Sequence, residues 1–219
     1  MPITFPRSHG QFLDLLPVLE ATRPRLTEQV TQSRARAGQI ERTDIGDRLW
    51  YGRITVQPDE QGQTDQLYSQ VHLLTEAAGS FLWYRKARLG PQGDPTGSIL
   101  GAATPTLGAV SGDLRDLTIN GLPANYILRA GDMLSFQYGS GPVRYALHEV
   151  VVQRQATVGG QITLLSVAPL VAPGWGAGSA ITLVRPTCKA IIVPESLDPS
   201  KDFNRMATSF TFDWLETRK

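Results

Sequence analysis

The stretch Trp50-Tyr51-Gly52-Arg53-Ile54-Thr55-Val56-Gln57 predicts a β-strand. Its first, third, fifth and seventh residues (Trp, Gly, Ile and Val) share one face of an extended chain, and the residues between them share the other. A second segment of this kind, Phe210-Thr211-Phe212-Asp213-Trp214-Leu215, lies near the other end of the sequence. We therefore expect both ends of the chain to contribute strands to one domain.

One clear helix is predicted between these strands. From Thr64 to Ala78, apolar residues recur at the spacing of a single helical face. Asp59 or Thr64 could cap its start, and Gly79 stands where a left-handed residue often ends a helix. The segment Phe81-Leu82-Trp83-Tyr84 predicts a short aromatic strand after the helix, and a weaker helix is expected over residues 11–16.

The middle of the chain differs in composition from its flanks. Residues 99–186 hold five basic and four acidic residues, whereas residues 1–98 hold 11 of each sign. A loop rich in Gly and Pro, residues 90–97, precedes the middle, and Arg185-Pro186 closes it. We interpret residues 99–186 as a small β-domain inserted into a host domain formed by residues 1–98 and 187–219.

Short strands are expected at regular intervals through this middle segment. Gly-rich turns at Gly139-Ser140-Gly141-Pro142 and Val158-Gly159-Gly160-Gln161 predict hairpins. Evenly spaced short strands favour a small barrel or a sandwich. The predicted strands lie near residues 116–120, 132–138, 144–154, 161–167 and 180–184.

Composition excludes several classes of protein. The chain has 219 residues, 41% of them hydrophobic, which is too apolar for a disordered protein. Its net charge of +1 argues against a protein that grips phosphate backbones, and its one cysteine cannot form an internal disulfide. The uncharged segment 155–184 is interrupted by Gly and Pro, so we expect strands there and no membrane insertion.

The sequence offers no motif of an enzyme, a metal site or a cofactor site. The three histidines, His9, His72 and His148, are far apart and lack ligand spacing, and neither a nucleophile elbow nor a phosphate-binding loop is present. Cys188 begins an apolar run and is expected to be a buried structural thiol. The carboxylate pairs 44/47 and 113/116 lie in turn-like contexts, where Asp binds local amides. We therefore predict no catalytic, metal-binding or cofactor-binding residues.

An arginine-rich segment between Arg23 and Arg53 stands out. It holds seven arginines and four acidic residues, and its part from Gln32 to Gln39 is typical of the tip of a polar hairpin. Single-stranded DNA binding would need aromatic residues among the arginines, and none occurs before Trp50. Two interpretations remain open: an interface between subunits, where Arg is enriched, and a solvated edge hairpin.

The order of these segments resembles the tail proteins of long-tailed bacteriophages, most of all the distal tail proteins. The pattern consists of a polar hairpin, the strand motif Gly46-Asp47-Arg48-Leu49-Trp50-Tyr51-Gly52, a single helix, and the aromatic strand at Phe81. It continues through Leu128-Arg129-Ala130-Gly131-Asp132, the Gly159-Gly160 turn and Val167-Ala168-Pro169-Leu170-Val171, and ends with the strand at Phe210. The resemblance covers nearly the whole chain.

The resemblance implies a fold, an assembly and a set of partners. It implies a mainly β fold: a split β-barrel with one α-helix, interrupted by the small inserted β-domain. Six copies would form a ring that joins the tail tube protein to the baseplate hub protein in the virion, after synthesis in the cytoplasm of the bacterial host. DNA would pass through the lumen without specific binding. We expect inter-subunit contacts from Arg34, Arg36, Gln39, Trp50 and Tyr51.

Other functions are kept as alternatives. The chain could form a related ring of the tail tube or beside the hub, because such proteins share the host barrel. The inserted domain could instead recognise a cell-surface carbohydrate, with Trp175 stacking on a sugar from its Gly-rich loop. An enzyme that hydrolyses cell walls would need a pair of acidic residues across a cleft, and the sequence places none.

Overall fold

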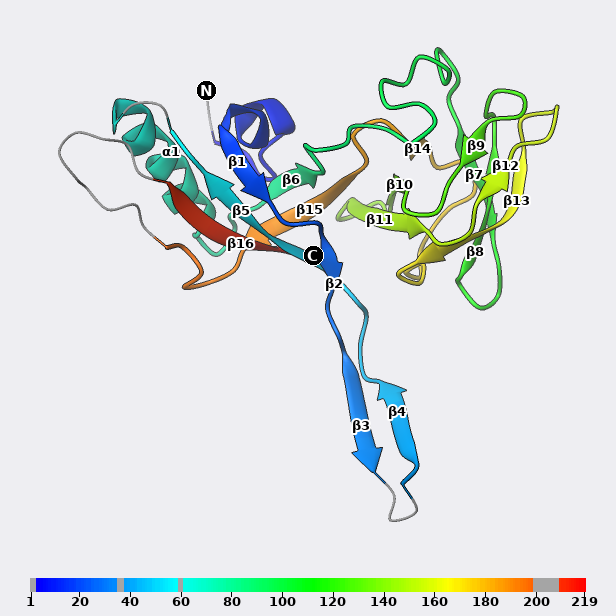
Figure 1. The fold of residues 1–219 in the computed structure, drawn as a ribbon, viewed down its shortest axis with the longest axis horizontal. Coiled ribbons are helices and arrows are strands. Elements are labelled where there is room, and N and C mark those ends of the chain that lie inside the picture. The colour runs from blue at the N-terminus through cyan, green and yellow to red at the C-terminus, as the bar shows by residue number, and fades with distance from the viewer. Residues whose placement is uncertain (1–2, 35–37, 59–60, 199–208) are drawn as a thin grey trace.

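The computed structural model describes residues 3–34, 38–58, 61–198 and 209–219. Within these ranges the chain forms two large sheets, two small two-stranded sheets and a single α-helix (Figure 1). The prediction of a mainly β protein with one helix is therefore confirmed.

The first large sheet joins segments from both ends of the sequence and curls into a half-barrel. Its central strands, β5 and β16, pair antiparallel with Ile54 opposite Phe212 and Gly52 opposite Trp214. The predicted alternation is confirmed, because every second residue of β5 and of β16 is buried and the residues between them are not. Gly52 gives the indole of Trp214 room, since a Cβ atom at this position would lie 3.0 Å from Trp214 Nε1. The strand order is β1 (Val18–Ala21), β5 (Trp50–Val56), β16 (Phe210–Glu216), β15 (Thr187–Ile192) and β6 (Phe81–Tyr84), with β2 (Arg25–Leu26) also paired to β5.

The helix α1 (Gln61–Leu74) covers this sheet and begins and ends earlier than predicted. Its apolar face, with Val71 fully buried, belongs to the core of the first sheet. Thr64 lies inside the helix and does not cap it, and Asp59 lies outside the described residues. The backbone of Gly79 does not adopt the predicted left-handed conformation. Glycine is required at this position because a Cβ atom would come within 2.3 Å of the carbonyl oxygen of Leu74. Two short 3-10 turns, η1 (His9–Gln11) and η2 (Leu13–Leu15), replace the weaker helix that was expected.

The second large sheet is built from the middle of the chain. A β-bridge between Thr106 and Ala180 joins its two end strands, and two backbone hydrogen bonds of 2.8 Å flank the bridge, from Leu107 N to Ser179 O and from Ile181 N to Pro105 O. The strand order is β14 (Ile181–Thr182), β10 (Met133–Tyr138), β11 (Arg144–Val150), β13 (Ile162–Ala168), β8 (Asp116–Asn120) and β7 (Thr106–Val110). The short strands β9 (Ile127–Leu128) and β12 (Arg154–Gln155) pair with each other.

The two Gly-rich turns of this segment behave differently. The turn at Gly139–Pro142 connects the paired strands β10 and β11, as predicted. The turn at Val158–Gln161 is closed by a hydrogen bond from Thr157 N to Gln161 O, but its flanking strands do not pair. Instead β12 pairs with β9, and β13 pairs with β8 and β11. The hairpin predicted there is therefore wrong, because the strand expected over 144–154 is interrupted after Val150 and its last residues turn to β9.

Each large sheet has its own hydrophobic cluster. The cluster of the first sheet contains the indole rings of Trp83 and Trp214, which stack with centroids 4.1 Å apart. The second cluster is formed by the inward side chains of the second sheet. Met133 and Leu147 of the second sheet belong to the first cluster, so apolar packing also joins the two sheets.

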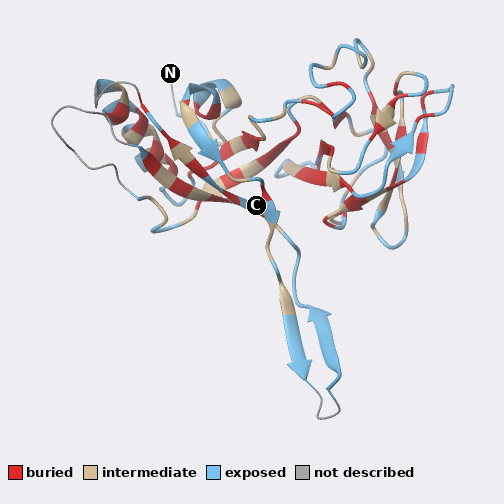
Figure 2. Cartoon of the chain, in the orientation of Figure 1, coloured by how far each residue is buried: buried red, intermediate tan, exposed pale blue. Residues whose placement is uncertain are grey.

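A two-stranded arm extends away from both sheets. It consists of β3 (Val30–Arg34) and β4 (Ile40–Asp44), which pair only with each other among the described residues (Figure 1). Apart from the half-buried Val30, every residue of both strands is exposed (Figure 2). The polar hairpin predicted from the arginine-rich segment is confirmed as a projecting structure.

Candidate functional site

The exposed arm offers both strand edges and a cationic face to the solvent. Its register places Arg34 opposite Ile40 and Gln32 opposite Arg42, so these four side chains share one face. Neither Arg34 nor Arg42 forms an ion pair with another described residue. Ile40 is a large apolar side chain that is 54% exposed on this otherwise polar face. Such a surface has the composition of a contact site for another molecule.

The base of the arm is fixed to the first sheet. The Thr27 amide donates to the carbonyl oxygen of Leu49 at 2.8 Å, and the Leu49 amide donates to Thr27 Oγ1 at 2.9 Å. Arg218, just after β16, pairs with Asp47 at 2.5 Å. Beyond the base, where Asp44 also pairs with Arg48 at 3.7 Å, the described residues of β3 and β4 contact each other through their own ladder.

The residues predicted as inter-subunit contacts do not form one surface. Arg34 and Gln39 are exposed near the tip of the arm, and Arg36 lies outside the described residues. Tyr51 is 37% exposed on the outward face of β5, beside Arg25 at the base of the arm. Trp50 is only 2% exposed because it begins the inward-facing set of the same strand. Trp50 is therefore buried within the subunit and does not present its side chain for the contact predicted there.

Trp50 instead connects the two large sheets. Its indole Nε1 donates a hydrogen bond of 2.7 Å to the carbonyl oxygen of Leu147 in β11, and its backbone amide donates to Glu216 Oε2 at 2.9 Å. A further buried bond, from Thr187 N to Ser135 Oγ at 2.8 Å, joins β15 to β10. These bonds hold the two sheets together where β10 and β11 meet β15.

Two buried titratable groups lie beside this junction. Burial raises the pKa of Glu216 to about 7, although the hydrogen bond from Trp50 N and the charge of Arg218 act in the opposite direction. Burial lowers the pKa of His148 to about 4. His148 Nδ1 donates to the carbonyl oxygen of Pro169 at 2.9 Å, while its buried Nε2 has no hydrogen-bond partner. The sequence analysis considered the histidines only as possible ligands and did not foresee this buried environment.

One of these groups could have been found from the sequence. Glu216 continues the inward-facing series of Phe210, Phe212 and Trp214, so the period of two already places its carboxyl group inside the sheet. His148 carries a weaker signal. It shares one face of β11 with the buried Ala146 and Val150, and its ring stacks on Phe136, but Leu147 on the opposite face is buried as well, so the period of two does not single it out.

Ion pairs add to the junction on its outer side. Arg23, which follows β1, contacts Glu149 of β11 at 2.5 Å, and Arg88 contacts the buried Asp132 at 3.6 Å. The Asp132 carboxylate also accepts hydrogen bonds from the backbone amides of Gln92 and Arg129, each 2.8 Å long. Arg85 lies among these groups without a carboxylate partner of its own among the described residues.

The other residues singled out from the sequence have local roles. Trp175 is half-buried and packs against the second hydrophobic cluster. Cys188 is fully buried, as predicted, and burial raises the pKa of its thiol. Asp113 accepts hydrogen bonds from Ser111 and from the Arg115 amide, which is the turn role expected for it.

Comparisons with known proteins do not assign the chain to a family. The sequence matches no known protein family, and a search of curated proteins also gives no match. In the described ranges, no group of three or more His, Cys, Asp or Glu residues is arranged to hold a metal ion. No helix in the described part of the chain is both long and apolar enough to cross a bilayer.

Proposed function

We propose that this chain is a non-enzymatic structural protein of a bacteriophage tail tip. In this proposal it is a distal tail protein, and six copies form a ring that joins the tail tube to the baseplate hub. The single observation that carries the proposal is the projecting arm of β3 and β4, two exposed strands that pair with no other described strand of the chain.

The physical argument rests on unpaired strand edges. An exposed strand presents free N–H and C=O groups that readily pair with another chain, and natural proteins avoid leaving such edges open. In a ring with rotational symmetry, each copy's arm contacts its neighbour and no edge is left over. The arm is therefore best explained as a contact between copies, with Arg34 and Gln39 near its tip and Tyr51 near its base; the predicted contact Arg36 lies outside the described residues.

The division into domains is part of the same proposal. Residues 1–98 and 187–219 would form the host split barrel, and residues 99–186 would form an inserted small barrel. The bridge between Thr106 and Ala180 supports closure of this second sheet. The two separate hydrophobic clusters support two folding units in one chain.

The proposed ring can be tested with the purified chain. Electron microscopy of negatively stained particles and light scattering after gel filtration should reveal six-fold rings. The double variant Arg34→Glu/Arg36→Glu should lose the ring while circular dichroism shows a folded monomer. A matched variant, Arg129→Glu/Arg154→Glu, reverses two exposed charges of the middle segment away from the arm and should still form rings.

Two results would count against the proposal. A chain that stays monomeric at tens of micromolar, and is absent from any ring in assembled particles, would contradict the ring itself. Intact rings from the arm variant would contradict the assigned contact. An image of the virion with this protein labelled would distinguish the distal ring from a tube ring or a ring beside the hub.

A further inference from the structure

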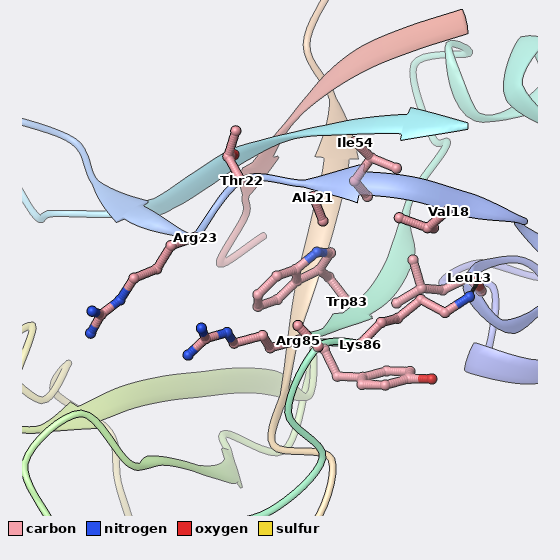
Figure 3. A pocket seen from close by; sticks show the side chains of 11 residues that line it. Leu13, Val18, Ala21, Thr22, Arg23, Ile54, Trp83, Arg85 and Lys86 are labelled. Atoms are coloured by element: carbon pink, nitrogen blue, oxygen red, sulfur yellow. Dashed lines mark hydrogen bonds between the residues drawn. The ribbon is translucent and has the colours of Figure 1, made fainter. Parts of the chain in front are cut away.

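The half-barrel leaves a small cavity between its two end strands. The cavity measures about 50 Å³ and is lined by residues of β1 and of β6 with the segment that follows it (Figure 3). Because β1 and β6 are the strands at which the sheet fails to close, the cavity lies in the slot of the half-barrel.

The floor of the cavity is apolar and rigid. It is formed by buried side chains that include Leu13, Ile54 and Trp83. The indole ring of Trp83 cannot swing away, because its other face stacks on Trp214. A volume of about 50 Å³ corresponds to roughly three to five water-sized positions at about 10–15 Å³ each. The space therefore fits a short aliphatic group.

The rim of the cavity is cationic. Arg23, Arg85 and Lys86 surround it, and the guanidinium groups of Arg23 and Arg85 lie on the same side of Trp83 (Figure 3). Lys86 Nζ is already bound to the carbonyl oxygens of Leu13 and Leu16, at 3.1 and 2.9 Å. Arg23 is paired with Glu149.

Arg85 is the cation of this rim that lacks a partner. Its guanidinium forms no hydrogen bond or ion pair with any described residue, although Arg85 is half-buried and Glu149, the partner of Arg23, lies close enough to act on its charge. Burial lowers its pKa, and the nearby charges of Arg88 and Arg23 lower it further. An anion at the guanidinium would offset this repulsion, and a carboxylate suits it best because two parallel N–H···O bonds can form.

We propose that the cavity binds a carboxylate carried on a short aliphatic group. The carbon chain lies against Trp83, and the carboxylate binds Arg85. Two sources supply this chemistry: a free short-chain acid, and the C-terminal carboxylate of a polypeptide that ends in an aliphatic residue. The site is independent of the proposed ring, since none of its residues belongs to the arm.

The proposal is tested by titrating 4-methylpentanoate into the full chain and following the indole N–H signal of Trp83 by NMR. The chain has four tryptophans, so the signal is assigned with the variant Trp83→Phe. We expect a saturable shift of the Trp83 signal with the acid and none with 4-methylpentanamide, which lacks the charge. A missing shift at millimolar acid, or an equal response to the amide, would overturn the proposal.

Three variants locate the ligand. Arg85→Gln should weaken binding about tenfold or more, because it removes a charge-assisted hydrogen bond to the carboxylate. Ala21→Leu fills the lining without changing the charge and should also weaken binding. Arg129→Gln removes an exposed arginine outside the cavity and should bind as the wild type does. Unchanged affinity in Arg85→Gln would disprove the assignment.

A parallel titration distinguishes the two sources. The peptide acetyl-Gly-Leu is used as the free acid and as the C-terminal amide. Tighter binding of the peptide acid than of 4-methylpentanoate would identify a polypeptide terminus, and binding of 4-methylpentanoate alone would identify a free acid. Failure of both acids would rule out the site while leaving the proposed ring untouched.

Discussion

The two large sheets differ in whether their end strands are joined. The second sheet comes from one continuous segment, and the bridge between Thr106 and Ala180 joins its end strands. The first sheet combines distant segments, leaves β1 and β6 unjoined, and carries the exposed arm. Features suited to contact with other molecules, the arm and the slot with its cationic rim, therefore gather on the first sheet.

Chain connectivity explains part of this difference. Arg53 and Asp213, which pair across the centre of the first sheet, are 160 positions apart in sequence, whereas β10 and β11 are joined by one short turn. Closing the longer loop costs on the order of 3 kcal/mol more in chain entropy. The first sheet offsets this cost with a cluster rich in aromatic side chains, including Trp83, Trp214 and Phe212.

The largest expected effect comes from weakening that aromatic cluster. Phe212 is fully buried, so Phe212→Ala should lower the free energy of unfolding by about 3–5 kcal/mol through lost burial and a residual cavity. Urea unfolding followed by circular dichroism measures the change. Thr211→Ala alters the outward face of the same strand and should change stability by less than about 1 kcal/mol. Equal effects would mean that this cluster does not hold the first sheet together.

Two buried groups, one in each sheet, should give the chain opposite responses to pH. The pKa of Glu216 is raised from 4.5 to about 7, so between these values the folded chain keeps a proton that the unfolded chain has lost. The free energy of unfolding then falls as pH rises through this window, by up to about 3 kcal/mol. The pKa of His148 is lowered from 6.5 to about 4, so between these values the unfolded chain binds the extra proton. Its contribution rises with pH and is lost on acidification.

These opposing contributions separate in single variants. Glu216→Gln should remove the fall, so that stability rises from pH 4.5 to 6.5, whereas His148→Phe should leave a steady fall from pH 4.5 to 7. The readout is the slope of unfolding free energy against pH, which does not depend on the absolute stability of each variant. A slope in Glu216→Gln that matches the wild type would show that this carboxyl group does not titrate inside the sheet.

A smaller effect is expected at the junction between the sheets. Trp50→Phe removes the indole N–H that binds the Leu147 carbonyl and leaves this buried acceptor unpaired, which should cost about 1–3 kcal/mol. Urea unfolding measures the loss, and Trp175→Phe, at a half-buried ring of the second sheet, is the matched control with less than about 1 kcal/mol expected. If Trp175→Phe lost stability and Trp50→Phe did not, the hydrogen bond from Trp50 to Leu147 would not be a contact that stabilises the junction.

The sequence predicted those parts of the structure that local periodicity determines. The alternation in β5 and β16, the helical face around Val71 and the hairpin between β10 and β11 all follow from side-chain spacing. The pairing of β12 with β9 could not be foreseen, because it depends on where the backbone turns after Val150. A hairpin turn indicates a reversal of the chain, but tertiary contacts choose the partner strand.

The candidate sites were less accessible to sequence reasoning. The arginine-rich hairpin was predicted because polarity and spacing are local properties. The alternation in β5 groups Trp50 with Ile54 and Val56, but Trp50 was predicted to be an inter-subunit contact, and its burial between the sheets was not foreseen. The cavity beside Trp83 could not be predicted, because Arg23 and Arg85 are brought together only when the first sheet curls and places β1 near β6.

The smallest effect on stability should come from removing the arm, the exposed feature that the first sheet carries and the second lacks among the described residues. Replacing residues 31–43 by Asn-Gly joins Val30 to Asp44 through a tight turn and deletes a ladder that packs on no other described residue. The free energy of unfolding in urea should change by less than about 0.5 kcal/mol, because exposed residues without partners contribute little to folding. Ring formation should be lost in the same variant, as judged by electron microscopy. A loss of stability above about 1 kcal/mol would instead mean that the arm folds back onto its own chain, and the exposed strands would then need no neighbour to explain them.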